Sequence, residues 1–257
     1  MVAHINGAGD TISRILSQFP TTPTVADEVM IENIFSAMSR KGLHPFTVFK
    51  PHDRVISIAG GGPSLSDTME NLTGEIVTMQ GAQRYLLDHG IRPYAVGVLD
   101  ANEHIADQIE ADPKSFYFVA SNCHPAVFDK LQNAGCDIIL YHAGGLPGIS
   151  QLLPKDTIIV GGGSTIGLRW INLAYLMGYR TIHLHGLDSN FRGGKSHAYN
   201  DYSAYINFGE YRTKLDFLQQ VEDFRQIRSD FENHGVTFHI HGEGLLQDVA
   251  RNMRECS

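Results

Sequence analysis

Short runs of hydrophobic residues alternate with amphipathic segments from Arg54 to the end of the chain. Apolar runs of this length are typical of buried strands, and apolar residues three and four apart are typical of helices covering a sheet. The predicted strands are Val55–Ala59, Ile76–Met79, Ala95–Leu99, Phe116–Ala120, Ile138–Tyr141, Ile158–Val160, Ile182–Leu184 and Val236–Ile240. The predicted helices are Ser66–Leu72, Ala82–Asp88, Glu103–Ile109, Ala126–Ala134, Leu168–Met177 and Lys214–His234. This alternation predicts an α/β fold with a doubly wound, mostly parallel sheet and helices on both faces.

Residues 1–50 have a different pattern and form a helical N-terminal lead-in, which packs either on the main domain of residues 51–257 or on a partner. The segment Pro20–Pro23 is a stiff connector, and Thr24 is a candidate cap for a helix that runs through Arg40. Gly42 is a natural stop for this helix. One apolar stripe is predicted on it, made of Val25, Val29, Ile34, Phe35 and Met38.

Composition and charge narrow the classes of protein. With 257 residues, of which 42% are hydrophobic and 19% charged, the chain can bury a full core and is expected to be soluble. A formal charge of −8 argues against nucleic acid and anionic membranes as general partners. Cys123, Cys136 and Cys256 lack paired spacing, which fits a reducing cytoplasm. The sequence predicts neither an export signal nor a transmembrane segment, and it leaves a homo-oligomer open.

Two strand ends run directly into three glycines and a small hydroxyl residue. The first turn is Gly60-Gly61-Gly62-Pro63-Ser64 and the second is Gly161-Gly162-Gly163-Ser164-Thr165. Glycine lets the backbone approach a ligand closely, and the following helix offers free N–H groups, so each turn is a candidate phosphate cradle. Leu65 replaces the third glycine of a dinucleotide fingerprint, and Ser189 replaces the first glycine of a P-loop ending at Gly194-Lys195-Ser196. NAD, FAD and P-loop ATPase sites are therefore not expected.

Polar residues and glycines follow the predicted strands at the same point, where each strand ends. They are Gly60–Gly62, Gln80, Asp100, Ser121, Asn122, His124, His142, Gly161–Gly163 and Asp188. In a parallel sheet all carboxyl ends lie along one edge, which is where open α/β folds bind ligands. The sequence therefore predicts a ligand site at this edge.

The segment Gly186–Tyr199 concentrates charged and polar chemistry in one loop. Arg192 and Lys195 are candidates for contacts to phosphate oxygens, and His197 for an acid or base near neutral pH. Asp188 is a candidate ligand for a metal or a hydroxyl group. The alternative is a solvated loop in which the aspartate caps a turn.

Two histidine pairs are spaced for one face of a strand each: His183 with His185, and His239 with His241. Neither pair has a third ligand at fixed spacing, so structural roles are expected and metal ligation is the alternative. Several aromatic residues either line an acceptor pocket or pack a lid or a subunit contact. They are Trp170, Tyr199, Tyr202, Tyr205, Phe208 and Tyr211.

An ordered set of motifs resembles a known family. The motifs are Ile58–Leu65, Val98–Asp100, His124-Pro125, Gly162–Ser164 with Leu173–Tyr179, Gly186–Asp188 and His197–Tyr199. Together they resemble the 6-hydroxymethylpterin diphosphokinase MptE-like family, which includes the motility accessory factor (Maf) domains and is similar in fold to bacterial sialyltransferases. The resemblance spans about residues 50–245 and implies a Rossmann-like transferase domain.

The resemblance implies a transferase whose donor carries a nucleotide phosphate. The donor would be ATP, whose diphosphate passes to a pterin-like hydroxymethyl group with Mg²⁺, or a CMP-linked nonulosonic acid in a glycosyltransferase. The residues expected around the nucleotide and its phosphates are Gly60, Gly61, Gly62, Ser64, Gln80, Gly162, Gly163, Ser164, Thr165, Arg192 and Lys195. Asp100 and Asp188 are expected to serve a metal or the ribose, and His197 the reacting hydroxyl. Relatives commonly have Asn where this chain has Gln80. A non-enzymatic nucleotide-binding module, docking through the lead-in helix, is a third alternative.

Overall fold

The computed structural model describes residues 8–18, 25–198 and 205–255. Several predicted features lie outside these ranges. They are the connector Pro20–Pro23, the cap Thr24, the aromatic residues Tyr199 and Tyr202, and Cys256.

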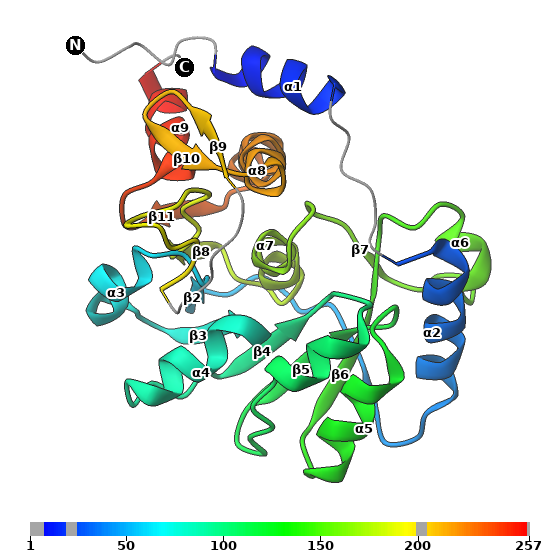
Figure 1. The fold of residues 1–257 in the computed structure, drawn as a ribbon. Coiled ribbons are helices and arrows are strands. Elements are labelled where there is room, and N and C mark those ends of the chain that lie inside the picture. Colours follow the sequence, from blue (N-terminus) through cyan, green and yellow to red (C-terminus); the bar gives the residue numbers. More distant parts are fainter. Residues whose placement is uncertain (1–7, 19–24, 199–204, 256–257) are drawn as a thin grey trace.

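A central parallel sheet organises the molecule (Figure 1). Its strands are β1 (His44–Pro45), β2 (Val55–Ala59), β3 (Glu75–Met79), β4 (Ala95–Val98), β5 (Phe116–Ala120), β6 (Ile138–Ala143), β7 (Ile159–Val160), β8 (Thr181–His185) and β11 (Thr237–Ile240). The spatial order is β1-β6-β5-β4-β3-β2-β8-β11, with β7 beside β6, and every neighbouring pair is parallel. All eight predicted strands are present, which confirms the doubly wound α/β fold.

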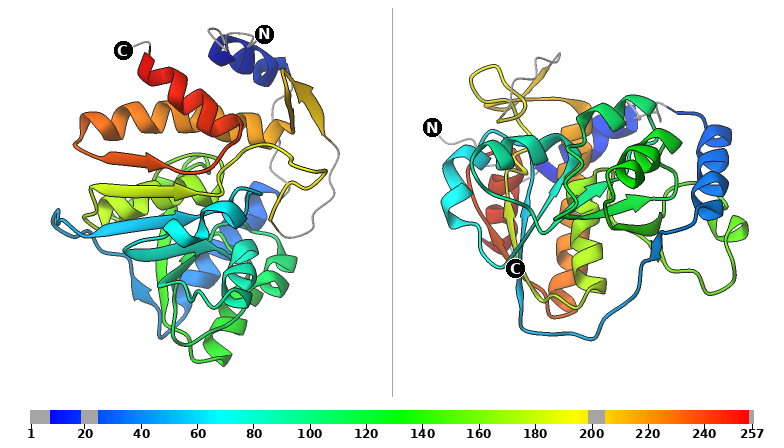
Figure 2. Two further views of the ribbon diagram at one scale, coloured as in Figure 1. Left: turned by 90° about the vertical axis from the view of Figure 1, so that its left-hand side faces the viewer. Right: turned by 90° about the horizontal axis from the view of Figure 1, so that it is seen from below.

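Helices cover both faces of this sheet (Figure 2). They are α3 (Leu65–Thr68), α4 (Gln80–Asp88), α5 (Pro125–Asn133), α6 (Ile149–Leu152), α7 (Ile166–Leu176), α8 (Leu215–Asn233) and α9 (Leu245–Glu255), with the short 3-10 helices η1 (Met69–Asn71) and η2 (Glu103–Gln108). The segment Glu103–Ile109 was expected to be α-helical and instead forms η2. The sequence pattern also missed α6, α9, β1 and a small hairpin of β9 (Ile206–Phe208) with β10 (Tyr211–Thr213).

Strand order reverses beside β2. The chain runs from β2 outward through β3, β4, β5 and β6, and then returns to place β8 on the other side of β2. Helix α7 makes this return, because it begins after β7 at the far part of the sheet and ends before β8. The carboxyl ends of β2 and β8 therefore flank the switch point, where open α/β sheets leave a crevice.

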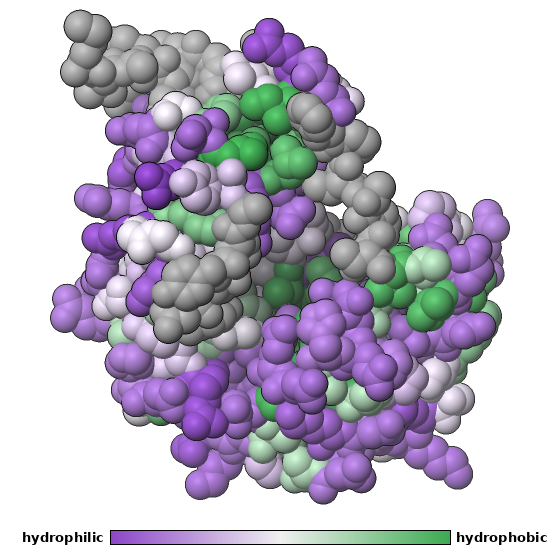
Figure 3. All heavy atoms as spheres, in the orientation of Figure 1, coloured by the Kyte–Doolittle hydropathy of each residue, from purple (hydrophilic) through white to green (hydrophobic). Residues whose placement is uncertain are grey.

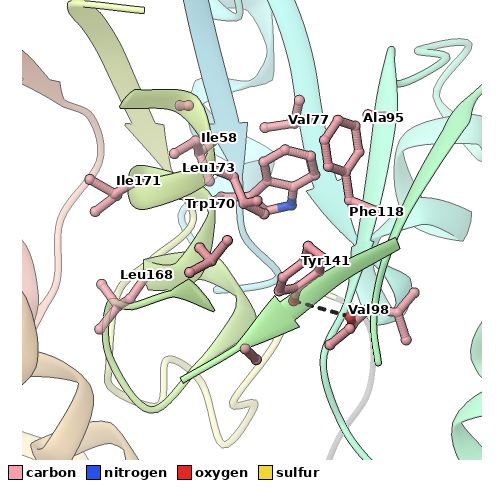
Figure 4. Close-up of a cluster of buried hydrophobic side chains, with 14 of the residues drawn as sticks. Ile58, Val77, Ala95, Val98, Phe118, Tyr141, Leu168, Trp170, Ile171 and Leu173 are labelled. Carbon is pink, nitrogen blue, oxygen red and sulfur yellow. Dashed lines mark hydrogen bonds between the residues drawn. The ribbon is translucent and has the colours of Figure 1, made fainter. Parts of the chain in front are cut away.

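Trp170 of α7 lies at the centre of the core between α7 and the sheet (Figure 4). Its ring is fully buried and packs against Phe118 at a centroid distance of 5.0 Å. The indole N–H donates to the carbonyl of Thr78 at 2.8 Å, which satisfies the one polar group of the ring. Trp170 is therefore part of the core, and the expectation that it lines an acceptor pocket is wrong.

The lead-in packs on the main domain. Helix α1 (Ala8–Gln18) contacts α8, and α2 (Asp27–Ser39) contacts α5. Asn33 donates to the carbonyl of Asn122 at 3.0 Å, and Arg40 pairs with Asp129 at 2.7 Å. None of the described helices combines the length and apolar composition that a bilayer crossing needs.

Two details of α2 differ from expectation. The residue before its first turn is Ala26, which makes no side-chain cap. Ile34 is fully buried, whereas Phe35 is 52% exposed, because each step of one residue along a helix rotates the side-chain direction by about 100°. Of the other members of the predicted stripe, Val29 and Met38 are also exposed, and Val25 is half-buried. Figure 3 shows hydrophobic side chains among polar ones on the side of the molecule where α2 and α6 lie.

Candidate functional site

A cavity of about 140 Å³ opens at the switch point, at the carboxyl ends of β2 and β8. Its walls come from the first glycine turn, the end of β3, the start of α7, the segment after β8 and the first turns of α8. The lining residues are Gly61, Gly62, Met79, Thr165, Ile166, Gly167, Gly186, Leu187, Asp188, Ser189, Ser196, His197, Phe217 and Gln220. Five predicted site residues are therefore brought together here: Gly61, Gly62, Thr165, Asp188 and His197.

The first glycine turn is interlocked with the end of β8. The N–H of Gly60 donates to the carbonyl of His185 and that of Gly62 to the carbonyl of Gly186, both at 2.7 Å. A Cβ atom at Gly60 would overlap the carbonyl of Gly186, and one at Gly62 would lie 2.7 Å from the same oxygen. These glycines are needed because two backbones approach closely, and their N–H groups face the protein.

Asp188 lies beneath this turn and is almost completely buried, at 1% exposure. Its carboxylate accepts the backbone N–H of Ser64 at 2.6 Å, the hydroxyl of Ser64 at 2.5 Å and the side-chain amide of Gln247 at 3.0 Å. Burial raises the pKa of Asp188, and these hydrogen bonds oppose the rise. Asp188 therefore joins α3, β8 and α9, and both of its oxygens already have donors.

The second glycine turn lies outside the cavity except for Thr165. Gly162 and Gly163 have positive φ angles, so this turn uses glycine for its left-handed backbone. The N–H of Ser164 donates to the carboxylate of Asp223 on α8 at 2.7 Å. Gly162, Gly163 and Ser164 do not line the cavity.

Arg169 of α7 hydrogen-bonds to the second glycine turn and stabilises it. It is 6% exposed, and its guanidinium donates to the carbonyls of Val160 at 2.6 Å, Gly163 at 3.1 Å and Gly144 at 3.2 Å. Burial lowers the pKa of Arg169. The guanidinium group of Arg169 thus connects the second glycine turn to the end of β7 and to the residue after β6. These hydrogen bonds hold the first turn of α7 in position.

Helix α7 begins at the cavity. Thr165, Ile166 and Gly167 line it, and the hydroxyl of Thr165 accepts the N–H of Leu168 at 3.4 Å as the helix cap. A helix N-terminus carries a partial positive charge, so this wall favours an anion. The start of α7 is the part of the second motif that reaches the site.

The loop after β8 supplies Ser196 and His197. The hydroxyl of Ser196 lies 3.0 Å from Nδ1 of His197, and the N–H of Ala198 donates to the carbonyl of Gly61 at 2.8 Å. This bond attaches the loop to the first glycine turn. His197 therefore faces the cavity as predicted from its place in the loop.

Arg192 and Lys195 are exposed on the same loop and are not among the lining residues. Arg192 forms an ion pair with Asp67 of α3, and the backbones of Arg192 and Lys195 hydrogen-bond each other. Neither cation is directed at the cavity in this conformation.

Asp100 and Gln80 lie on the same carboxyl edge but outside the cavity lining. Asp100 is exposed and accepts the N–H of Asn102 at 2.9 Å, which is a local turn. Oε1 of Gln80 is buried and has no hydrogen-bond partner within the described residues. Among the residues that the structure describes, neither Asp100 nor Asp188 belongs to a group of three or more side chains that could hold a metal ion.

Sequence reasoning missed several wall residues. Phe217 and Gln220 come from α8, and Met79 and Leu187 come from strand ends. Phe217 is half-buried, with Nζ of Lys214 4.5 Å from its ring centroid. Nothing in the local pattern of α8 indicates which of its aromatic residues faces the cavity, because this depends on how the helix crosses α7.

Comparisons with known proteins identify a family and a similar fold. A family model described as 6-hydroxymethylpterin diphosphokinase MptE-like matches residues 28–194. The structure of a Maf glycosyltransferase from Magnetospirillum magneticum AMB-1 is similar, with a TM-score of 0.68 and 16% identity, over 98% of this chain and 45% of that chain. A mammalian sialyltransferase gives a TM-score of 0.43 at 12% identity, over 95% of this chain and 88% of that one. No curated protein matches the sequence.

The Maf likeness establishes the fold at this level of identity, and this chain spans less than half of that chain.

Proposed function

The chain belongs to the 6-hydroxymethylpterin diphosphokinase MptE-like family, and on this premise we propose that it is a transferase that uses a nucleotide-phosphate donor. One observation carries the proposal: the start of α7, the first glycine turn and His197 line a single cavity at the switch point of the sheet. Ligands of open α/β folds bind at such a point, and a helix N-terminus stabilises a phosphate there.

The residues that line the cavity have different roles in such a transfer. The N-terminus of α7 neutralises charge that develops on the donor phosphates. His197 accepts the proton of the acceptor hydroxyl, and Ser196 orients its ring through Nδ1. Phe217 offers an aromatic face for a base or a pterin ring. Asp188 is assigned a positioning role, because its three donors hold the turn and α9 in place.

The family description favours the diphosphokinase reaction. In it the acceptor hydroxyl oxygen attacks the β-phosphorus of ATP, the bond between the α-phosphate oxygen and that phosphorus breaks, and AMP leaves. The acceptor proton passes to His197. The second candidate is transfer of a CMP-linked nonulosonic acid to a hydroxyl group, which the likeness in fold to the Maf glycosyltransferase favours.

Mg²⁺ fits this site best as a partner of the donor phosphates. Both oxygens of Asp188 already accept hydrogen bonds, and Asp100 is exposed away from the cavity lining. Mg²⁺ is commonly held by one or two carboxylates together with substrate phosphates and water. When bound, the ion would neutralise phosphate charge, and the residues of the cavity would position the reacting groups.

Thermal shifts with ATP and Mg²⁺, with CTP, and with a CMP-sugar distinguish the donors, because a bound ligand stabilises the folded state. ATP with Mg²⁺ is expected to give the largest shift, and AMP formation with a hydroxymethyl pterin then identifies the reaction. A preference for CTP or the CMP-sugar would favour the glycosyltransferase. The absence of a shift with every nucleotide would contradict the proposal and favour a module without nucleotide chemistry.

A further inference from the structure

Four histidines form an array on the adjacent parallel strands β8 and β11, and none of them lines the proposed nucleotide cavity. His183 lies directly opposite His239 in the strand register, and the N–H of His241 donates to the carbonyl of Leu184 at 2.9 Å, which places it beside His185. The spacing of two along each strand puts all four side chains on one face of the sheet.

Three of these imidazoles are close enough to share one ion. His183, His185 and His241 each have a ring nitrogen within 4.8 Å of the other two, and Nδ1 of His183 lies 2.9 Å from Nε2 of His241. In a tetrahedral site with metal–nitrogen bonds of 2.0–2.1 Å, the ligand nitrogens lie roughly 3.4 Å apart. The rings of His185 and His241 are stacked at a centroid distance of 4.1 Å, so ligation requires the rings to rotate toward a common point.

The second observation concerns His185. Its side chain is fully buried, and neither ring nitrogen has a hydrogen-bond partner of ordinary geometry within the described residues. A buried imidazole that only packs is expected to hydrogen-bond, because an unpaired buried polar group costs free energy. Ligation of an ion would satisfy one of these nitrogens.

Metal ions bind the neutral form of imidazole. Burial, followed by the neighbouring histidines, lowers the pKa of His183 to about 4 and that of His185 to about 3. Burial also lowers the pKa of His241. Each of these shifts favours the neutral form of the ring.

A cavity of about 480 Å³ beside β11 reaches the trio at His241. His239 and His241 line it, together with Arg228 and Arg251. Both arginines have carboxylate partners, Arg228 with Glu232 at 2.9 Å and Arg251 with Asp248 at 2.8 Å. The cavity leaves room for water or a small anion as a fourth ligand.

We propose that His183, His185 and His241 bind one divalent transition-metal ion of the zinc class. Imidazole nitrogen suits Zn²⁺, Co²⁺, Ni²⁺ and Cu²⁺, whereas Mg²⁺ prefers oxygen, so this site is separate from any Mg²⁺ that accompanies a nucleotide. Three histidines with one open position are a ligand set that zinc adopts in proteins. The proposal does not depend on the function proposed above.

Calorimetry with Zn²⁺ on the chelator-treated full chain tests the site. One ion per chain is expected for the unaltered protein and for the matched control His239→Ala, which removes the exposed histidine outside the trio. His183→Ala and His241→Ala are each expected to weaken binding by more than the roughly 10–100-fold that follows loss of an outer partner of a metal ligand. The proposal is overturned if these two variants bind Zn²⁺ like the control.

A Co²⁺ titration of the unaltered protein keeps the test decisive if a variant does not fold. Tetrahedral ligation by nitrogen gives intense visible absorption that Zn²⁺ abolishes by displacement and Mg²⁺ leaves unchanged. Failure of the unaltered protein to bind Zn²⁺, or a weak octahedral Co²⁺ spectrum, would overturn the proposal. Neither measurement uses transferase activity. A negative result for the metal site is therefore distinguishable from failure of the proposed function.

Discussion

The carboxylate of Asp188 accepts two hydrogen bonds from Ser64, one from its backbone N–H at 2.6 Å and one from its hydroxyl at 2.5 Å. The second glycine turn repeats the arrangement, since the N–H of Ser164 donates to Asp223 at 2.7 Å. In both turns a carboxylate from a distant element takes the N–H of the serine after the glycines. The anion held at each serine is therefore part of the protein, which leaves the start of α7 as the place where we propose that a donor phosphate binds.

Asp188→Asn is expected to lower the free energy of unfolding as well as turnover. In asparagine an NH2 group replaces one carboxylate oxygen, so at least one of the three donors around Asp188 loses its acceptor and faces another donor. Loss of a charged hydrogen bond in a buried place costs about 1–3 kcal/mol. Urea unfolding measures the change. Asp100→Asn is the matched control, because Asp100 is exposed and holds only a local turn. Equal stability of the two variants would refute this account of Asp188.

Gly60→Ala is expected to destabilise the protein by more than about 2 kcal/mol, because its Cβ would meet the carbonyl of Gly186. The other glycine turn offers a matched control. A Cβ at Gly161 has no neighbour within 4 Å, and its φ angle is not in the left-handed region, so Gly161→Ala is expected to be neutral or slightly stabilising. Thermal unfolding of both variants distinguishes close backbone approach from a general need for glycine.

Arg169→Met removes three hydrogen bonds to carbonyls of the second glycine turn and its neighbourhood. The expected loss is about 2–4 kcal/mol, because buried carbonyls are left without donors. Arg92→Met is the comparison, since Arg92 makes a half-exposed ion pair with Asp112 and its removal is expected to cost under about 1 kcal/mol. Chemical denaturation gives both values, and similar losses would contradict the bracing role of Arg169.

His197→Ala is expected to reduce turnover by roughly 100-fold or more, the scale of general base catalysis, with little change in melting temperature.

Phe217→Ala is expected to weaken donor or acceptor binding, whereas Phe217→Tyr retains the aromatic face. Steady-state kinetics with the donor identified by thermal shift measure both effects. Unchanged kinetics of both alanine variants would remove these residues from the site.

Cys123 is expected to resist thiol reagents in the folded protein. It is fully buried, and burial raises the pKa of its thiol. Burial also raises the pKa of the Cys136 thiol, but Cys136 is only half-buried. Reagents reach it more easily, so it is expected to react before Cys123. Mass spectrometry after timed alkylation identifies each labelled residue. Rapid labelling of Cys123 without denaturant would show that the core opens readily.

The pattern of hydrophobic residues was sufficient for the strands, because each runs through a buried parallel sheet where short apolar segments stand out. Strand ends such as Gly60–Gly62 and Asp188 were correctly grouped at one edge, since parallel strands share their direction. The loop position of His197 was also enough to place it at the cavity.

Other features depend on contacts that no local pattern records. The strand β1, with only His44 and Pro45, is defined by its pairing with β6. The second glycine turn was expected beside the first, but β7 pairs with β6 at the far part of the sheet, so only Thr165 reaches the cavity. The histidine trio needs β8 and β11 to be neighbours, and their separation in sequence conceals this.

The paired backbones of Gly60 with His185 and Gly62 with Gly186 join two strands that are far apart in sequence. Separating the two strands would break both hydrogen bonds at once. The backbone of the first glycine turn and of the residues after β8 is therefore expected to remain rigid when a ligand enters. Adaptation to ligands of different size then falls to the side chains of Met79 and Phe217, which can change rotamer without disturbing the sheet.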